Sequence, residues 1–202
     1  MDTAAAAGWA PLALAEAFFA GGATLVQVRA KQLASGPFLD LCDAVVALGR
    51  RGGARVIVND RVDLAVLAGA AGAHVGQDDL APAAARAQLG PAAILGYSTH
   101  DPAQVTAAAA EPVTYIAVGP IFGTRTKDTG YQPVGLDLVR AARRLAGACP
   151  IVAIGGITID NAASVLEAGA TAVAVIGDLL AGGDPAARVA SYNRLASARP
   201  GG

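Results

Sequence analysis

Three polar side chains occupy alternate positions where the first apolar stretch of the chain ends. They are Gln27, Arg29 and Lys31, within QVRAK. In a β-strand this spacing points all three to one face, which in a closed barrel is the interior. Inward-facing polar groups are costly unless water, a ligand or an anion meets them at the barrel mouth. Arg and Lys at such a mouth suit a diphosphate, and a solvated edge strand is the alternative interpretation.

Carboxylates follow the next two apolar stretches. Asp60 comes directly after RVIVN, and Asp78 and Asp79 follow HVGQ. Asp60 alone would be interpreted as a helix cap. If the two stretches are neighbouring parallel strands, however, all three carboxylates reach the same rim, beside the basic cluster. Magnesium prefers a few carboxylate oxygens together with substrate phosphate oxygens, so the pattern predicts a site for a magnesium diphosphate.

Glycines end the last two apolar stretches, in VAIGGITIDNA at 152–162 and AVIGD at 174–178. Close backbone approach and free amides at a helix start make a phosphate cradle, and barrels often place one after their last two strands. The long loop at 118–135 adds hydroxyls and cations at 124–127. These suit an anionic ligand under a closing flap, and a solvated surface loop is the alternative. The sequence therefore predicts a second anion site, for a phosphate.

The remaining candidates are Ser98, His100 and His74. Ser98 and His100 follow a strand in GYSTHD, but nucleophile-elbow spacing and an assignable supporting acid are both missing. We interpret Ser98 as a hydrogen-bond donor and His100 as a structural rim residue. His74 lies inside an apolar stretch, where a histidine with satisfied hydrogen bonds is expected. The pattern therefore does not favour nucleophilic catalysis.

The elements that must position these residues alternate between short apolar strands and helical segments. The expected strands are 24–29, 55–59, 72–76, 93–98, 114–119, 150–154 and 171–176. Strands this apolar indicate a parallel sheet buried by helices, such as the helix that Asp101 and Pro102 would start. Because every strand ends in polar residues, we favour a parallel (β/α)8 TIM-type barrel over an open, doubly wound sheet.

An eight-stranded barrel needs one more strand before the first helix. The chain offers only MDTAAAAGWAPLALAEAFF there, and Asp2 and Thr3 resemble the residues that follow a first strand. That strand is expected to be missing from this chain. A truncated or misassigned start, a gapped barrel and a strand lent by another chain are the alternatives that the sequence leaves open.

The composition limits the partners. At 202 residues the chain is expected to form a single domain over 1–202. With 15 Lys and Arg against 16 Asp and Glu, no excess charge favours nucleic acid or a membrane surface. No long apolar span or secretory signal stands out, so we expect a cytoplasmic location and small phosphorylated molecules as partners. Whether the chain forms a homo-oligomer stays open.

Six motifs together resemble the thiamine phosphate synthase family. In order they are QVRAK, NDRVDLA, GAHVGQDD, GYSTH, VGPIFGTRTKD and VAIGGITIDNAASVLEAGA, and the similarity runs over about 21–176. The resemblance implies transfer of a pyrimidine methyl group from its diphosphate to the ring nitrogen of a thiazole phosphate, with release of diphosphate. It implies a dissociative, Mg2+-assisted mechanism, in which positioning and preorganised charge supply most of the acceleration.

The resemblance also implies a role for each matching residue. The pyrimidine diphosphate would be held by Gln27, Arg29, Lys31, Asn59, Ser98 and Lys127, and magnesium by Asp60 and Asp79. The thiazole phosphate would be held by Thr124, Arg125, Thr126, Gly156, Ile176 and Gly177. The family usually has Ser at the last of these positions, so one hydroxyl contact is absent here. A thiazole tautomerase using His100 as acid and base, and a non-catalytic phosphate sensor, are the alternative functions.

Overall fold

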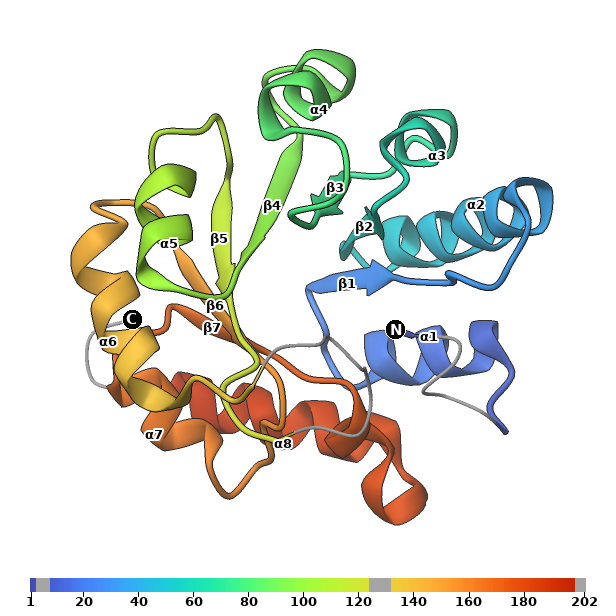
Figure 1. Cartoon of the computed structure of the whole chain (residues 1–202). Helices are drawn as coiled ribbons and strands as arrows, with labels where there is room; N and C mark the ends of the chain where they lie inside the picture. Colours follow the sequence, from blue (N-terminus) through green and yellow to red (C-terminus); the bar gives the residue numbers. More distant parts are fainter. Residues whose placement is uncertain (3–7, 124–131, 199–202) are drawn as a thin grey trace.

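The core of the molecule is a parallel sheet of seven strands that are hydrogen-bonded in chain order. The computed structural model describes residues 1–2, 8–123 and 132–198. The strands are β1 Leu25–Val28, β2 Arg55–Asn59, β3 Gly72–Val75, β4 Ile94–Thr99, β5 Tyr115–Val118, β6 Ile151–Ile154 and β7 Ala172–Ala174. Each overlaps a strand that the sequence predicts. The sheet curls (Figure 1), and because all its pairings are parallel, the carboxyl ends of its strands lie at the same end of the sheet.

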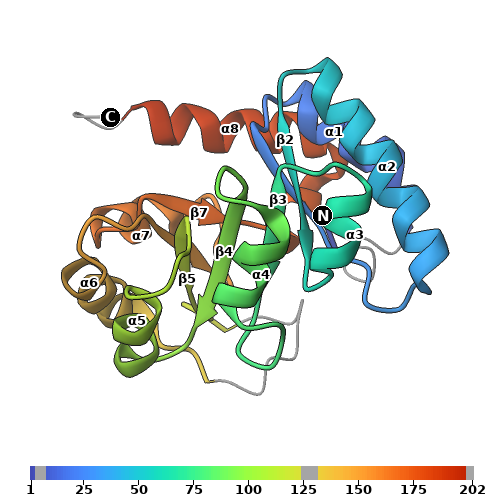
Figure 2. The same cartoon turned by 90° about the horizontal axis from the view of Figure 1, so that it is seen from above.

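Helices cover the outer face of the curled sheet (Figure 2). They are α1 Pro11–Ala20, α2 Ser35–Arg51, α3 Val62–Leu67, α4 Pro82–Leu89, α5 Pro102–Ala108, α6 Gly135–Leu145, α7 Ala162–Glu167 and α8 Pro185–Ser197, with a 3-10 segment η1 at Gly177–Gly183. The predicted start at Asp101 is confirmed, because its side chain accepts a hydrogen bond from Gln104 N. No helix in the described ranges has the length and apolar character needed to span a membrane.

Two large apolar clusters hold the helices to the sheet. One contains Val28, Val58 and Leu95 with residues of α2, α3 and α4; the other contains Ile116 and Ile151 with residues of the later helices. The opposite face of the sheet encloses a smaller layer.

That inner layer consists of Ile57, Ile94, Tyr115 and Ala117. These side chains fill the concave side of the curled sheet, toward the amino ends of the strands. Space for a ligand is therefore left at the carboxyl ends.

The sheet is open between its first and last strands. Within the described residues, β1 pairs with no strand other than β2, and β7 with none other than β6. An isolated parallel bridge joins Asp2 to Arg29, the residue that follows β1. The structure therefore shows a curled, seven-stranded α/β sheet.

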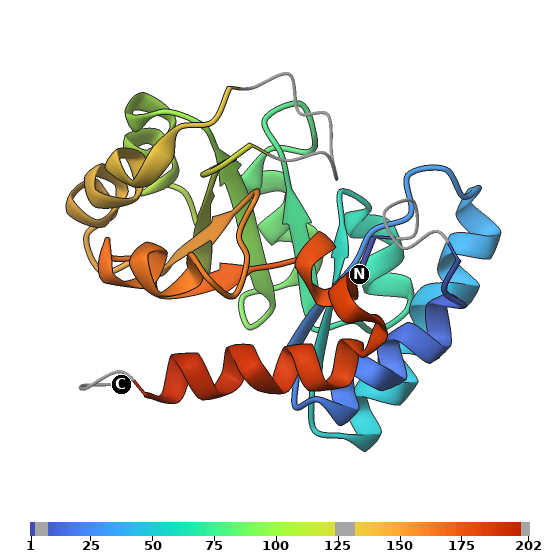
Figure 3. The same cartoon turned by 90° about the horizontal axis from the view of Figure 1, so that it is seen from below.

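Helix α8 lies against α1 beside this open side (Figure 3). Asn193 Nδ2 donates to the carbonyl oxygens of Gly21 and Gly22, at 3.2 and 3.0 Å. A Cβ atom on Gly21 would come within 2.4 Å of the Ala186 carbonyl oxygen, so a residue without a side chain permits the close approach.

Candidate active site

A cavity of about 710 Å³ lies at the carboxyl ends of the strands. Ten of the predicted site residues line it: Gln27, Arg29, Lys31, Asn59, Asp60, Asp79, Ser98, Gly156, Ile176 and Gly177. The other four, Thr124, Arg125, Thr126 and Lys127, lie outside the described residues. Residues separated by as many as 150 positions in the chain therefore meet around one opening, as the barrel hypothesis requires.

The basic cluster enters this cavity from the end of β1. Lys31 Nζ lies 2.8 Å from Asp60 Oδ2, and the Arg29 guanidinium is paired with the buried carboxylate of Asp2. Arg29 Nε is buried, and none of the described residues accepts its hydrogen bond. A buried charged donor without an acceptor is costly, so an anionic ligand would satisfy this corner of the cavity.

Two carboxylates converge beside the cluster. Asp60 follows β2 with a φ of +62°, and Asp79 Oδ2 accepts a hydrogen bond from Gly76 N at 2.7 Å. A non-glycine residue in the left-handed region costs about 1 to 3 kcal/mol and is found mainly where the surrounding structure enforces it, often at functional sites. The backbone at Asp60 is therefore held in a strained conformation that directs its carboxylate to the rim.

The nearby Asp60 affects the ionisation of Asp79. Partial burial and the adjacent Asp60 raise the pKa of Asp79, although the hydrogen bond from Gly76 acts in the opposite direction. A cation between the two would relieve this repulsion. In the described ranges no cluster of three or more His, Cys, Asp or Glu side chains could hold a metal. A magnesium ion here would therefore take its remaining ligands from water and a substrate.

A buried hydrogen-bond network forms the floor of the cavity. The two ring nitrogens of His74 lie 2.8 Å from Tyr115 Oη and from Ser98 Oγ. Burial raises the pKa of Tyr115, and a hydrogen bond with Gln27 partly offsets that effect. The hydrogen bonds of His74 are satisfied, as predicted. The predicted role of Ser98 as a donor depends on the tautomer of His74 and stays a prediction. Tyr115 was missed; the alternation of Tyr115 with Ala117 along β5 is the signal that could have placed it inside.

His100 lies on the rim, where both its side chain and its backbone form hydrogen bonds. Its Nδ1 lies 2.6 Å from the carbonyl oxygen of Gly119, and its own N–H donates to Gln104 Oε1 at 2.7 Å. These contacts fit the predicted structural role.

The predicted phosphate cradle lies after β6 and β7. Gly156 has a φ of +63°, and a Cβ atom there would come within 2.6 Å of the Gly123 carbonyl oxygen. Only glycine fits this turn. Asn161 braces it, since Nδ2 donates to Gly156 O at 3.1 Å and Oδ1 accepts from Thr158 N at 2.9 Å. The amides of Gly156 and Gly177 donate to no other part of the described chain.

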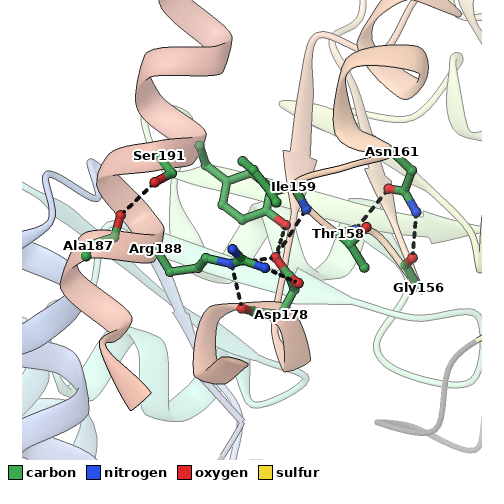
Figure 4. A network of polar contacts seen from close by, with 9 residues as sticks. Gly156, Thr158, Ile159, Asn161, Asp178, Ala187, Arg188 and Ser191 are labelled. Carbon is green, nitrogen blue, oxygen red and sulfur yellow. Dashed lines mark hydrogen bonds and ion pairs between the residues drawn. The ribbon is translucent and has the colours of Figure 1, made fainter. Parts of the chain in front are cut away.

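A further carboxylate, Asp178, stands beside the cradle (Figure 4). It accepts hydrogen bonds from Ile159 N at 3.2 Å, from Arg188 Nη2 at 2.8 Å and from Tyr192 Oη at 2.6 Å. Burial opposes its ionisation, but the hydrogen bonds from Arg188 and Tyr192 outweigh it and lower the pKa of Asp178. Sequence reasoning missed this residue. The i, i+4 spacing of Arg188 and Tyr192 on one helix was the available signal.

Comparison with known proteins decides the family. A family model described as thiamine monophosphate synthase matches residues 3–179. The chain belongs to this family. A thiamine-phosphate synthase of Koribacter versatilis is 46% identical over 183 residues, covering 90% of this chain and 84% of the relative. The Thermus thermophilus thiamine-phosphate synthase is 44% identical, over 88% of this chain and 86% of the relative.

Solved structures of other enzymes show a similar fold. Thiamine phosphate pyrophosphorylase from Pyrococcus furiosus has a TM-score of 0.84 and 27% identity, covering 92% of this chain and 89% of that one. A 3-hexulose-6-phosphate synthase from Salmonella typhimurium, 18% identical with a TM-score of 0.63, shares the fold alone. It covers 86% of each chain. The predicted resemblance to the thiamine phosphate synthase family, and the transferase activity that goes with it, are confirmed.

Proposed function

We propose that this member of the thiamine monophosphate synthase family joins 4-amino-2-methyl-5-hydroxymethylpyrimidine diphosphate to 4-methyl-5-(2-phosphooxyethyl)thiazole. The products are thiamine phosphate and diphosphate. One observation carries the proposal: a cationic cluster with two carboxylates and a two-glycine cradle open into the same cavity. The reaction needs two anion sites within reach of each other, and the cationic cluster and the glycine turns are the groups that could provide them.

The pyrimidine diphosphate is proposed to bind on the β1 to β4 side, through Gln27, Arg29, Lys31, Asn59 and Ser98, with Lys127 from the loop. The unsatisfied Arg29 Nε supports an anion here. Lys31, already within 2.8 Å of Asp60, brings a second cation to the same place. These groups would hold the diphosphate while its bond to the pyrimidine methylene breaks.

Magnesium is proposed to bind Asp60 and Asp79. Their shared position at the rim and the raised pKa of Asp79 fit a divalent cation between them. When bound, Mg2+ supplies charge neutralisation for the departing diphosphate. The left-handed backbone at Asp60 keeps that carboxylate in place before the ion arrives.

The thiazole phosphate is proposed to bind on the opposite side, at Gly156, Ile176 and Gly177, with Thr124, Arg125 and Thr126 from the loop. The amides of Gly156 and Gly177 support this role, because they are left without an acceptor within the described chain. Held by its phosphate, the thiazole would present its ring nitrogen to the pyrimidine.

The proposed chemistry is dissociative and needs no base. The bond between the pyrimidine methylene carbon and the diphosphate oxygen breaks, and its electron pair leaves with diphosphate. The thiazole nitrogen then uses its lone pair to form the new carbon–nitrogen bond, and no proton is transferred. Both ring nitrogens of His74 form hydrogen bonds, with Tyr115 and with Ser98. These contacts support a role for His74 in positioning the pyrimidine rather than in proton transfer.

We also propose that the open side between β1 and β7 is the place of the first strand of a (β/α)8 barrel. Met1 and Asp2 support this, because Arg29 N donates to Met1 O at 2.9 Å in a parallel arrangement. The cytoplasmic location and the small phosphorylated partners belong to the same proposal.

The test is a coupled assay. The protein is incubated with both substrates and Mg2+, and diphosphate and thiamine phosphate are quantified together. Equal amounts of the two products, formed only when both substrates and the metal are present, are expected. Diphosphate release that is independent of the thiazole, or no release at all, would overturn the proposal.

A further inference from the structure

The Asp178 carboxylate connects three segments that are distant in the chain. It belongs to η1, which follows β7, and it receives the backbone N–H of Ile159 from the turn after β6. From α8 it accepts hydrogen bonds from Arg188 Nε at 3.0 Å and Nη2 at 2.8 Å, and from the Tyr192 hydroxyl. Figure 4 shows the contacts from Ile159 and Arg188 converging on the Asp178 side chain.

Both glycine turns of the cradle are adjacent to these contacts. Gly177 precedes Asp178 directly, and Ile159 follows Gly156 by three residues in a turn that Asn161 makes rigid. The hydrogen bond from Ile159 N to Asp178 therefore ties one turn to the other. No direct hydrogen bond between the two turns replaces it within the described residues.

The charge of Asp178 requires compensation at this place. A bare carboxylate lining the cavity would repel a bound phosphate. Here the side chain is only 9% exposed and is paired with the Arg188 guanidinium, while Tyr192 donates a further hydrogen bond. Ion pairing and hydrogen bonding of this kind neutralise the carboxylate and fix its geometry.

We propose that Asp178, held by Arg188 and Tyr192, is a positioning residue that sets the separation of the Gly156 and Gly177 turns and thereby the affinity for the substrate phosphate. This inference rests on the proposed function, which assigns the thiazole phosphate to those turns. Asp178 acts through the backbone amides beside it and touches no reacting atom.

The test is the Asp178→Asn variant. Asparagine keeps the shape of the side chain but loses the ion pair with Arg188, so the tie to Ile159 is weakened. Loss of a charge-assisted hydrogen bond predicts a KM for the thiazole phosphate that is raised roughly tenfold. The KM for the pyrimidine diphosphate and kcat are expected to stay within about twofold of the wild type.

A substrate without the phosphate gives the decisive readout. The unphosphorylated thiazole alcohol makes no use of the cradle, so its kcat/KM should be the same in the wild type and in Asp178→Asn. The preference of the enzyme for the phosphorylated thiazole should therefore fall roughly tenfold. An active variant with an unchanged preference would overturn the inference, and so would an equal loss with both thiazoles.

Two further variants separate positioning from folding. Asp184→Asn is the matched control, because Asp184 caps α8 by accepting a hydrogen bond from Ala187 N at 3.0 Å and is not among the described residues that line the cavity. It should leave the phosphate preference unchanged. Tyr192→Phe removes one hydrogen bond only and should lower the preference about threefold even if Asp178→Asn fails to fold. A Tyr192→Phe protein with full preference would count against the inference.

The wild-type assay distinguishes the two levels of the argument. If the wild type releases no diphosphate with both substrates and Mg2+, the proposed function fails. If the wild type is active and the variants keep its phosphate preference, only the role of Asp178 fails.

Discussion

The two anion sites proposed for the cavity use different kinds of chemical group. On the β1 to β3 side, the donors and ligands are side chains: Arg29, Lys31 and two aspartates, one of them on a strained backbone. On the β6 to β7 side, they are backbone amides of glycine turns, held in place by Asn161 and Asp178. Substitution should therefore abolish chemistry on the first side and weaken binding on the second.

Asp60→Asn should have the largest effect. It removes one of the two carboxylates proposed to hold magnesium, so kcat should fall roughly 100- to 1000-fold. Asparagine tolerates the left-handed conformation, so the melting temperature should change little. Asp63→Asn is the control, because Asp63 is an exposed partner of Arg61 one turn away. Turnover of Asp60→Asn near the wild-type rate would remove the contrast between the two sides.

Gly156→Ala tests the backbone side. The added Cβ atom would meet the Gly123 carbonyl oxygen and displace the turn, so kcat/KM for the thiazole phosphate should fall roughly tenfold. Gly147→Ala is the matched control, with a φ of +57° but open space around the added atom. Each substitution should cost about 1 to 2 kcal/mol of stability from the left-handed backbone. Equal kinetics in the two variants would show that the turn does not bind substrate.

Asp79→Asn should have the smallest effect of the three substitutions. The direction in which it changes the melting temperature is informative. Because the folded pKa of Asp79 is raised, its contribution to stability is fully present below the unfolded pKa and is lost as the pH rises through the folded pKa. Without Mg2+ at pH 7, the variant should therefore melt about 2 °C higher than the wild type. The difference should vanish near pH 3.

Magnesium should reverse that order. Added Mg2+ should raise the melting temperature of the wild type and leave that of Asp79→Asn unchanged, since a ligand stabilises only the form that binds it. Thermal melts at several pH values, with and without the ion, measure both effects. A wild type that does not respond to Mg2+ would contradict the proposed metal site.

The convergence of the site was predictable because it follows from strand order. Gln27, Asp60 and Asp79 end consecutive apolar stretches, and parallel strands bring such ends to one rim. The same rule predicted the glycine cradle after the last two strands. These predictions needed only local patterns and the assumption of a parallel sheet.

What the sequence did not predict depends on partners distant in the chain. Asp178 is an ordinary acidic residue until α8 packs with Arg188 and Tyr192 facing it. Tyr115 becomes part of the cavity floor through its hydrogen bond with His74, which lies two strands away on β3.

The position of α8 has a consequence for the whole molecule. Arg188 and Tyr192 contact Asp178 beside the cradle that follows β7. On the same helix, Val189 packs against α1 and β1, and Asn193 donates to the Gly21 carbonyl oxygen at the end of α1. The final helix thus joins the two borders of an incomplete cylinder. Deleting α8 from the carboxyl terminus should therefore weaken phosphate binding at the carboxyl ends of the strands. This effect is expected even though the deletion removes no residue that is proposed to contact the ligand.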